Sequence, residues 1–302
     1  MSEPSRFSRW LSVGRGVFGP LALAFMAFAV WNGRDVAGEL ITQVNPWLLA
    51  FLATAWAGLN TLTPLATAMV LRGLGADIGY RTALRIHLQR LPARYLPGGI
   101  WHTVSRVVDL RRLGVSNAQL SSLVLVENVL PLATAVLLGA GLAALSTGHR
   151  IPVPALLAAG LLLLAALPWL QRRAPFRGDQ PLAPSALAIA IAVFLIFWLL
   201  AASLFAAYWW ALQIPGSGVG WLLPATIYLV AWSAGFVAVV APQGIGVFEA
   251  AAGWMLKGDA PFTTMALLVA GYRLVTLAGD LMAYAGLRLA DRLRLAAGKG
   301  VN

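Results

Sequence analysis

The chain has 302 residues, of which 60% are hydrophobic and 11% are charged, and its mean hydropathy is +0.78. Soluble domains carry about 25% charged residues, so this composition excludes an ordinary soluble domain and predicts an all-α polytopic membrane protein. The absence of cysteine excludes disulfides, thiolate catalysis and cysteine-ligated metal sites. The net charge is +11, but no polar surface interleaves basic with aromatic residues, so we expect no nucleic-acid partner.

Seven long apolar runs predict membrane-spanning helices in a single integral membrane domain over residues 1–302. A basic segment at residues 1–16 precedes the first run, and a basic tail at residues 288–302 follows the last. The predicted spans cover residues 17–31, 46–71, 120–145, 151–170, 186–212, 222–241 and 263–287.

Arginines predict the orientation of the chain. Basic residues concentrate at residues 1–16, 72–112, 171–180 and 288–302, and the positive-inside rule then puts both termini in the cytoplasm. Two cytoplasmic termini require an even number of crossings, against seven long runs. The apolar piece at residues 244–256 makes a helix of roughly 20 Å, too short for a ~30 Å hydrocarbon core. We therefore predict seven to eight crossings, with either this half-helix or a deeper Pro-Gly segment completing the count.

Two segments interrupt the apolar pattern with proline and glycine. The segment at residues 80–112 contains Pro97-Gly98-Gly99-Ile100, and the segment at residues 241–257 contains Pro242-Gln243-Gly244-Ile245. Broken backbone at membrane depth is tolerated only where protein or a water-filled cavity satisfies its polar groups. Matching interruptions in two halves of a membrane protein point to a transport site. We predict that both segments are re-entrant. Because the two segments resemble each other, an internal repeat of the chain is a further hypothesis.

The first half of residues 80–112 has the pattern of an amphipathic helix. Apolar residues recur on one helical face, with the arginines off that face; the apolar set is Leu84, Leu88, Leu91 and Tyr95. This pattern predicts a helix at the membrane surface with its apolar side in the acyl boundary, ended or kinked by Pro92. It leaves open whether this helix only anchors the protein.

Arg273 stands near the centre of the last apolar run, next to Tyr272. A cation there costs about 2.5–3.5 kcal/mol on insertion scales, so it needs a partner or a task. Helical spacing extends the position into one polar stripe of Arg273, Thr276, Asp280 and Tyr284. On the third run, Glu127 begins a shorter stripe with Pro131 and Thr134.

Two interpretations of these charges remain open. One is an interhelical Glu–Arg pair that only fixes packing. The other is that Arg273 binds a lipid phosphate with its planar fork, while Glu127 and Glu249 gate the site. Gly244 and Gly246 break the chain before Glu249, and the N-terminus of the restarted helix favours an anion. Glu249 is also a candidate for simple capping of that helix end.

His102 and Arg106 follow the first Pro-Gly motif at a spacing that puts them on one helical face. With only three histidines in the chain and scattered carboxylates, no metal-ligand spacing is present, and we expect no metal or cofactor. A hydrogen-bonding role for His102 is favoured over a proton-carrying one. No catalytic triad, carboxylate pair or phosphate-binding loop indicates a catalytic residue.

These motifs together resemble the lysylphosphatidylglycerol-synthase transmembrane, or flippase-like, family. The resemblance covers residues 45–290 and rests on LPARYLPGGIWHTVSRVVDLRRLGVSNAQ, the acid Glu127 in the next span, APQGIGVFEAA and a late GYR. It implies a protein of the bacterial cytoplasmic membrane, similar to the membrane half of enzymes that make and translocate lysyl-phosphatidylglycerol. Fused members append an aminoacyltransferase domain, so a chain ending at Asn302 is expected to be a stand-alone member.

The leading hypothesis is a lipid translocase that binds an anionic head group, phospholipid or polyprenyl-phosphate linked, in a polar cleft between the broken segments. Arg94 and Arg106 would collect the lipid at the cytoplasmic surface. The alternatives are a membrane-embedded head-group transferase and a non-catalytic membrane partner of a separate lipid-modifying enzyme. The candidate substrate-binding residues are Arg94, Pro97, Gly98, Gly99, Trp101, His102, Arg106, Glu127, Pro242, Gly244, Gly246, Glu249, Tyr272, Arg273 and Asp280.

Overall fold

A computed structural model describes residues 45–95, 100–146, 151–173, 176, 180–212, 220–238, 244, 246–255 and 262–299. Within these ranges the regular structure is helical throughout, which confirms the predicted all-α class. Residues 1–16, the predicted first span at 17–31, Pro97, Gly98, Gly99 and Pro242 lie outside the described ranges.

Five helical segments of the described chain are long and apolar enough to cross a membrane. They are α3 (Pro46–Leu59) with α4 (Thr63–Gly73), α7 (Asn117–Leu145), α8 (Val153–Gln171), α9 (Pro184–Ala211) and α12 (Phe262–Lys299). The predicted span at 222–241 is shorter, because α10 (Leu222–Val237) has 16 residues, or about 24 Å of helix.

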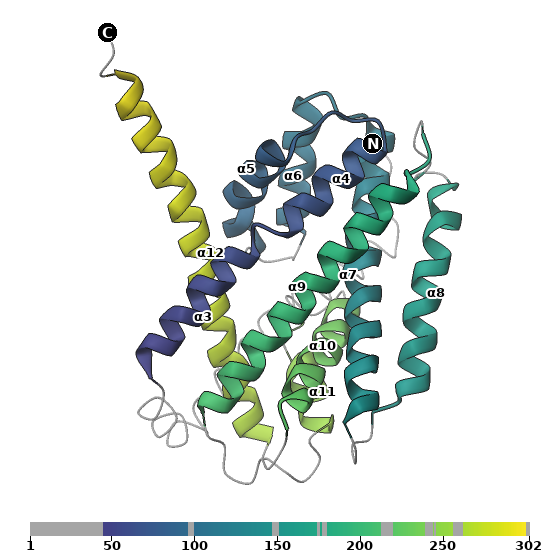
Figure 1. The fold of residues 1–302 in the computed structure, drawn as a ribbon, viewed down its shortest axis with the longest axis vertical. Helices are drawn as coiled ribbons and strands as arrows, with labels where there is room; N and C mark the ends of the chain where they lie inside the picture. The colour runs from purple at the N-terminus through teal and green to yellow at the C-terminus, as the bar shows by residue number, and fades with distance from the viewer. Residues whose placement is uncertain are drawn as a thin grey trace, which may run out of the picture.

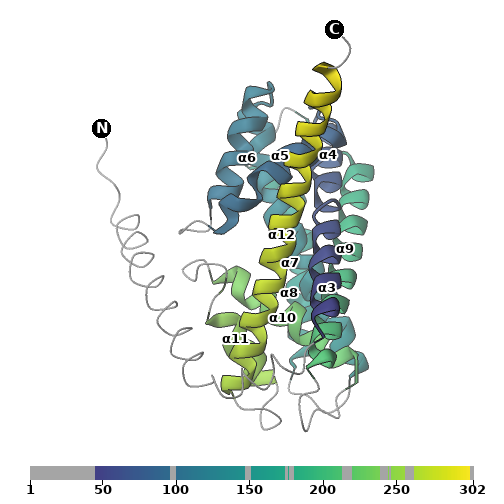
Figure 2. The same cartoon turned by 90° about the vertical axis from the view of Figure 1, so that its left-hand side faces the viewer.

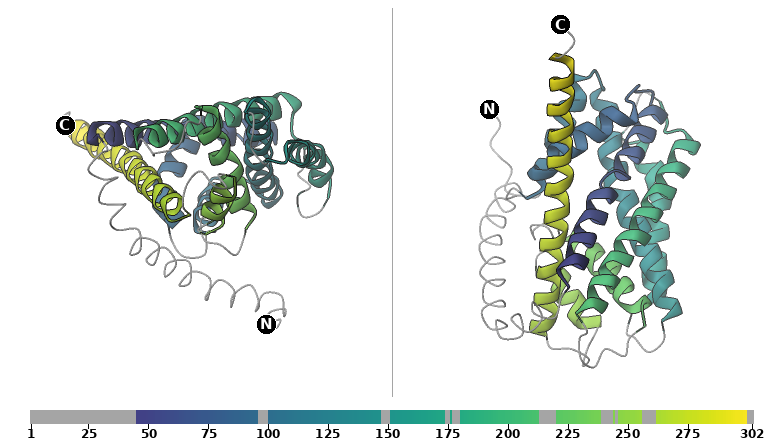
Figure 3. Two further views of the ribbon diagram at one scale, coloured as in Figure 1. Left: turned by 90° about the horizontal axis from the view of Figure 1, so that it is seen from below. Right: turned by 60° about the vertical axis from the view of Figure 1, so that its left-hand side comes forward.

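The long helices run up and down the bundle, as Figure 1 shows. With the C-terminus uppermost, α3 and α4 rise, α7 descends, α8 rises, α9 descends and α12 rises over the whole height. Helix α8 stands at the edge of the bundle and packs on α7 (Figure 3).

Between these helices lie two short helical hairpins. The upper hairpin consists of α5 (Tyr80–Arg90), the 3₁₀ helix η1 (Leu91–Tyr95) and α6 (Trp101–Arg112). The lower hairpin consists of α10 and α11 (Val247–Met255), and Figure 2 shows the two hairpins at opposite ends of the bundle. Pro92 was predicted to end or kink the first helix, because its nitrogen carries no hydrogen. Helix α5 ends at Arg90, two residues before Pro92.

The upper hairpin descends along α12. Arg85 of α5 pairs with Asp291 at 2.9 Å, and Arg94 of η1 pairs with Asp280 at 3.0 Å. Asp291 and Asp280 are eleven residues apart on one helix, a drop of about 16 Å. Arg90 donates to both carboxylate oxygens of Asp109, at 2.6 and 2.8 Å, and so joins the two arms of the hairpin.

Proline also breaks the first described span. Helix α3 ends at Leu59 and α4 begins at Thr63. A helix continued through this point would bring the Pro64 ring against the carbonyl of Asn60, four residues earlier. Asn60 and its two successors instead form a turn, with the Thr61 amide donating to the Gly58 carbonyl at 2.9 Å.

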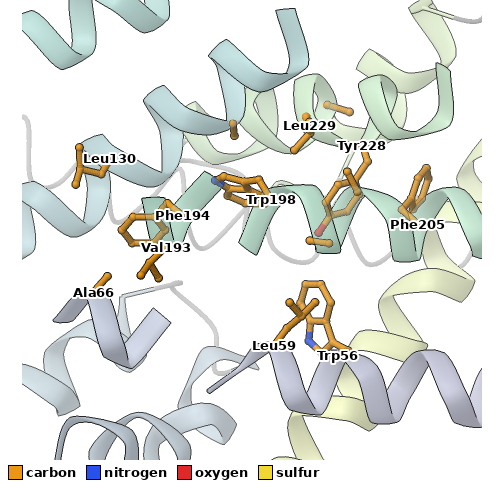
Figure 4. Close-up of a cluster of buried hydrophobic side chains, with 14 of the residues drawn as sticks. Trp56, Leu59, Ala66, Leu130, Val193, Phe194, Trp198, Phe205, Tyr228 and Leu229 are labelled. Carbon is orange, nitrogen blue, oxygen red and sulfur yellow. The ribbon is translucent and has the colours of Figure 1, made fainter. Parts of the chain in front are cut away.

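The apolar core lies where α3, α4, α7, α9 and α10 meet, and Figure 4 shows its large side chains. Aromatic rings from different helices contact one another there: Phe205 lies 5.2 Å from Tyr228 and 5.0 Å from Tyr272, centroid to centroid. The indole of Trp198 donates to the Pro131 carbonyl at 2.9 Å. This core packs α9 against α3, α4, α7 and α10.

One sequence expectation differs from the observed fold. Leu88 and Leu91 of the predicted amphipathic face are buried, at 8% and 0% exposure, because α5 packs on α4, α6 and α12. At these two positions the face is covered by protein, whereas Tyr95 at its end is 40% exposed. Residues 288–299 of the predicted basic tail continue α12 without a break, and Asp291 there is the partner of Arg85.

Close packing of α12 on α3 gives a stability prediction. A Cβ added at Gly279 would lie 2.6 Å from the Ala53 carbonyl oxygen and 2.8 Å from Trp56. We expect Gly279→Ala to destabilise the protein by roughly 1–3 kcal/mol, as overpacked cores do, measured as thermal unfolding in detergent. The matched control is Gly286→Ala on the same helix, whose added Cβ meets no described atom within 4 Å. An unchanged midpoint for Gly279→Ala would contradict the packing.

Candidate functional site

Asp280 of α12 accepts four hydrogen bonds in the protein interior. One carboxylate oxygen accepts from the Trp56 indole and the Asn60 amide, each at 2.9 Å. The other accepts from Arg94 at 3.0 Å and from the Tyr95 hydroxyl at 2.9 Å. Asp280 is 1% exposed. Four donors occupy the acceptor sites of a carboxylate, so this residue joins α12 to the α3–α4 turn and to η1.

Arg106 and Glu127 form a second ion pair, with side chains 10% and 17% exposed. The guanidinium donates to the two carboxylate oxygens at 2.8 and 3.1 Å. This bidentate geometry makes arginine–carboxylate pairs strong. The Thr67 hydroxyl donates to Glu127 at 2.6 Å and accepts from Arg106 at 3.0 Å. This triad joins α6, α7 and α4.

Glu249 and Arg273 form a third pair with a looser geometry. One oxygen of Glu249 accepts from the Gly246 amide at 2.7 Å, as a side chain at a helix start does. The other oxygen lies 3.5 Å from Arg273 Nε and has no hydrogen-bond partner among the described residues. Arg273 also lies over the Phe248 ring at 5.8 Å. The side chain of Arg273 is 25% exposed and that of Glu249 is 2% exposed.

Two glycines fix the backbone ahead of α11. Gly244 and Gly246 have φ of +67° and +85°, a region that other residues rarely adopt. A Cβ at Gly244 would lie 2.6 Å from the Gly235 Cα of α10. The absence of a side chain at Gly244 therefore allows the two arms of the lower hairpin to contact each other. Helix α11 begins directly after Gly246, with Glu249 in its first turn.

His87 and His102 lie edge to face beside the Asp280 cluster, with ring centroids 5.3 Å apart. His87 Nε2 lies 3.5 Å from the Asn60 side-chain oxygen. Burial, together with the charges of Arg94 and Arg106, lowers the pKa of His102 to about 2. Burial, Arg106, His102 and Arg94 likewise hold the pKa of His87 well below its usual value. Both rings are therefore neutral at physiological pH.

The predicted site residues fall into several groups. Arg94 and Asp280, Arg106 and Glu127, and Glu249 and Arg273 are brought together as pairs. Tyr272 instead packs in the aromatic core and is 4% exposed, while Trp101 is 47% exposed on α6. Among the described residues there is no cluster of three or more metal-ligating side chains.

Arg106 does not lie where the translocase hypothesis needs it. A residue that collects lipid at the cytoplasmic surface has to be exposed, but Arg106 is 9% exposed and paired with Glu127. Glu127 and Thr67 enclose its guanidinium, and the expected role of Arg106 in collecting lipid stays a prediction. Glu127 in turn lies in a pair with α6, which leaves Glu249 as the acid beside Arg273.

Sequence reasoning missed three donors to this network: Trp56, Thr67 and Tyr95. Trp56 and Thr67 lie in apolar helices and have no periodic signature of their own, and Tyr95 was interpreted only as part of the apolar face that begins at Leu84. Asn60 was visible as the one amide inside the apolar run 46–71, and that isolation was the available signal for its bond to Asp280.

The two hairpins meet the same helix near its middle. Arg273 and Asp280 are seven residues apart on α12, about 10 Å along the axis. Asp280 holds η1 of the upper hairpin and Arg273 holds α11 of the lower one. Asp280, Arg273 and their partners therefore lie in one interior zone, where the side chains of Arg94 and Arg273 are 31% and 25% exposed, each beside a buried acid.

Searches against protein-family models and curated proteins return no match. The family suggested by the motifs therefore stays a prediction.

The Arg106–Glu127 pair gives a second stability prediction. We expect Glu127→Gln to destabilise the protein by about 3–5 kcal/mol, because it leaves the buried Arg106 charge without a counter-charge. Replacing both residues by methionine is expected to restore most of the loss. Thermal unfolding in detergent measures both. As a control, Arg112→Met alters an exposed arginine, 75% accessible and 3.8 Å from Asp109, and should change little. A double variant no more stable than Glu127→Gln would contradict the pairing.

The lowered pKa values of His87 and His102 predict that the stability of the fold decreases at acid pH. Their folded pKa values lie below the unfolded value of about 6.5, so the unfolded chain binds more protons below that pH. Their contribution is complete above pH 6.5 and is lost as the pH falls, at up to about 1.4 kcal/mol per pH unit for each ring. Unfolding midpoints from pH 7.5 to 5 should therefore fall less in a variant with His87→Asn and His102→Asn. Equal slopes would count against burial of the two neutral rings.

Proposed function

We propose that the protein moves a lipid with an anionic head group between membrane leaflets, holding the head at Arg273 between the two hairpins. The observation that carries this proposal is the loose Arg273–Glu249 pair at the start of α11. Charges inside a membrane helix are costly and usually functional. A pair with a long contact and a partly exposed arginine is one that a phosphate can open.

The three ion pairs differ in how much they leave for a ligand. Asp280 is saturated by four donors, and Arg106 holds Glu127 with two bonds. Charge-assisted bonds of this kind are usually 2.7–2.9 Å long, whereas Arg273 Nε lies 3.5 Å from Glu249. The first two pairs therefore suit a structural role, and the third suits exchange of a carboxylate for a phosphate.

The site chemistry favours an anion. The guanidinium of Arg273 can bind two phosphate oxygens at once. The first turn of α11 directs free amides and the positive end of the helix dipole to the same region. One of these amides, that of Gly246, is taken by Glu249, so a phosphate and Glu249 compete for the same donors. This competition gives Glu249 the part of a gate.

The helix arrangement supports an inverted-topology repeat, with residues 46–145 and 184–299 as the two halves. Each half has a spanning element, a broken hairpin and a long helix: α3–α4, the upper hairpin and α7, then α9, the lower hairpin and α12. The second set runs in the opposite direction (Figures 1 and 2). The packing corresponds: α5 and η1 pack on α12 as α10 packs on α7, and α3 packs on α12 as α9 packs on α7.

The ion pairs also correspond between the two halves, with their charges exchanged. In the first half the hairpin arm α6 carries the arginine and α7 the acid; in the second, α11 carries the acid and α12 the arginine. Inverted repeats in transporters rock against each other around a site near the middle of the bilayer. Such a motion would expose Arg273 to each leaflet in turn.

A liposome assay tests this function. The purified chain is reconstituted with fluorescent phosphatidylglycerol, and dithionite quenching reports the lipid that crosses. We expect Arg273→Gln to slow translocation at least about tenfold, equivalent to 1.4 kcal/mol, and Arg273→Lys to retain part of the rate. Arg292→Gln, an exposed arginine on the same helix, is the matched control and should be neutral.

Two results would overturn the proposal. One is wild-type translocation in both Arg273→Gln and Glu249→Gln, provided that both variants fold. The other is a chemically modified head group found in the recovered lipid by mass spectrometry, which would identify a transferase instead.

A further inference from the structure

The turn between α3 and α4 leaves a groove on the outer surface of the bundle. It has a volume of about 330 Å³, and α9 forms its opposite wall. Its lining includes Gly58, Leu59, Thr61, Leu62, Ser203 and Leu204. The groove lies outside the ionic network just described.

Small residues create the hollow. A Cβ at Gly58 would meet no atom of the described chain within 4 Å, and Ser203 is the small residue on the α9 side. Leu59 forms the floor, at 5% exposure. Because the helix stops at Leu59 and restarts at Thr63, the side chains that a continuous helix would place here are displaced.

The polar atoms of the turn are used within the protein. The Thr61 hydroxyl donates to the Gly58 carbonyl at 2.7 Å, and the Thr61 carbonyl accepts from the Tyr80 hydroxyl at 3.0 Å. The Thr61 amide donates to Gly58 as well. The turn therefore presents an apolar wall, which matches hydrocarbon and not a polar head group.

The depth of the groove identifies its occupant. Gly58 and Leu62 lie near the middle of the 28-residue segment Pro46–Gly73, one of the segments suited to crossing a membrane. About 30 Å of hydrocarbon surrounds such a segment, so the groove faces lipid tails. An empty apolar hollow forfeits dispersion contacts on one side, and a flexible chain can supply them.

We propose that this groove binds one acyl chain of a membrane lipid. The chain lies between the α3–α4 turn and α9, over Leu59 and beside Gly58. Since Asn60 of the same turn donates to Asp280, the bound chain also braces the turn that holds this amide. The inference stands apart from lipid translocation, because it requires neither Arg273 nor movement between leaflets.

Photochemical labelling tests the groove in the reconstituted full-length protein. The probe is phosphatidylcholine with a diazirine in the middle of one acyl chain, and labelled peptides are identified by mass spectrometry. We expect Leu59, Leu62 and Leu204 to be labelled more than Leu161 and Leu162 of α8. These α8 residues are the control for ordinary lipid contact, being 59% and 68% exposed.

Filling the groove supplies the matched variant. Gly58→Leu combined with Ser203→Leu should reduce labelling of the groove at least about fivefold, or about 1 kcal/mol, and leave α8 labelling unchanged. Gly58→Ala, which adds one methyl group in open space, is the milder variant if the double variant does not fold, and it should lower labelling in part.

Three outcomes would overturn the inference. Labelling of α8 as strong as that of the groove would indicate ordinary bilayer contact only. Undiminished labelling in the folded filling variants would contradict the assigned position. Labelling by a phosphatidylglycerol probe but not by phosphatidylcholine would assign the groove to head-group recognition. None of these readings depends on the translocation rate, so each remains distinct from a failure of the proposed function.

Discussion

The need to partner charges inside an apolar bundle decides how this protein is assembled. A buried ion without a counter-charge is costly, and α12 carries both an acid and an arginine in its middle. Asp280 holds the turn between α3 and α4 together with η1, and Arg273 lies against Glu249 at the start of α11. Both hairpins are thereby tied to one helix, so displacement of α12 along its axis would disturb both ties.

These ties are not equivalent. Asp280 has a donor for each of its acceptor positions and almost no exposure, whereas the second oxygen of Glu249 finds no hydrogen-bond donor among the described residues. A saturated carboxylate resists exchange, since any new ligand has to displace several bonds at once. An under-saturated one is poised for change. In the function proposed above, the same kind of charge pair serves as a fixed support at one hairpin and as a replaceable contact at the other.

The sequence indicated the helices, the Pro-Gly interruptions and the polar stripe on α12, because these depend on local composition and periodicity. It could not indicate which acid meets which arginine, because that depends on which helices are neighbours. Glu127 was a candidate partner for Arg273, but the packing of α6 on α7 gives it Arg106 instead. For the same reason the apolar face of α5 was expected in lipid. Its amphipathic pattern is the same whether lipid or protein covers it.

The difference between the two proposed halves explains where the groove forms. In the proposed repeat, α3–α4 and α9 are counterparts, and they pack directly on each other. Pro64 lies just after a break in the first, whereas α9 runs unbroken for 28 residues. A straight helix against a broken one cannot match surfaces along its whole length, and the mismatch falls at the turn from Asn60 to Leu62. On its inner side this turn directs an amide to Asp280, and on its outer side it leaves the apolar hollow. One proline thus accounts for both features, and it couples the surface that faces lipid to the charged interior.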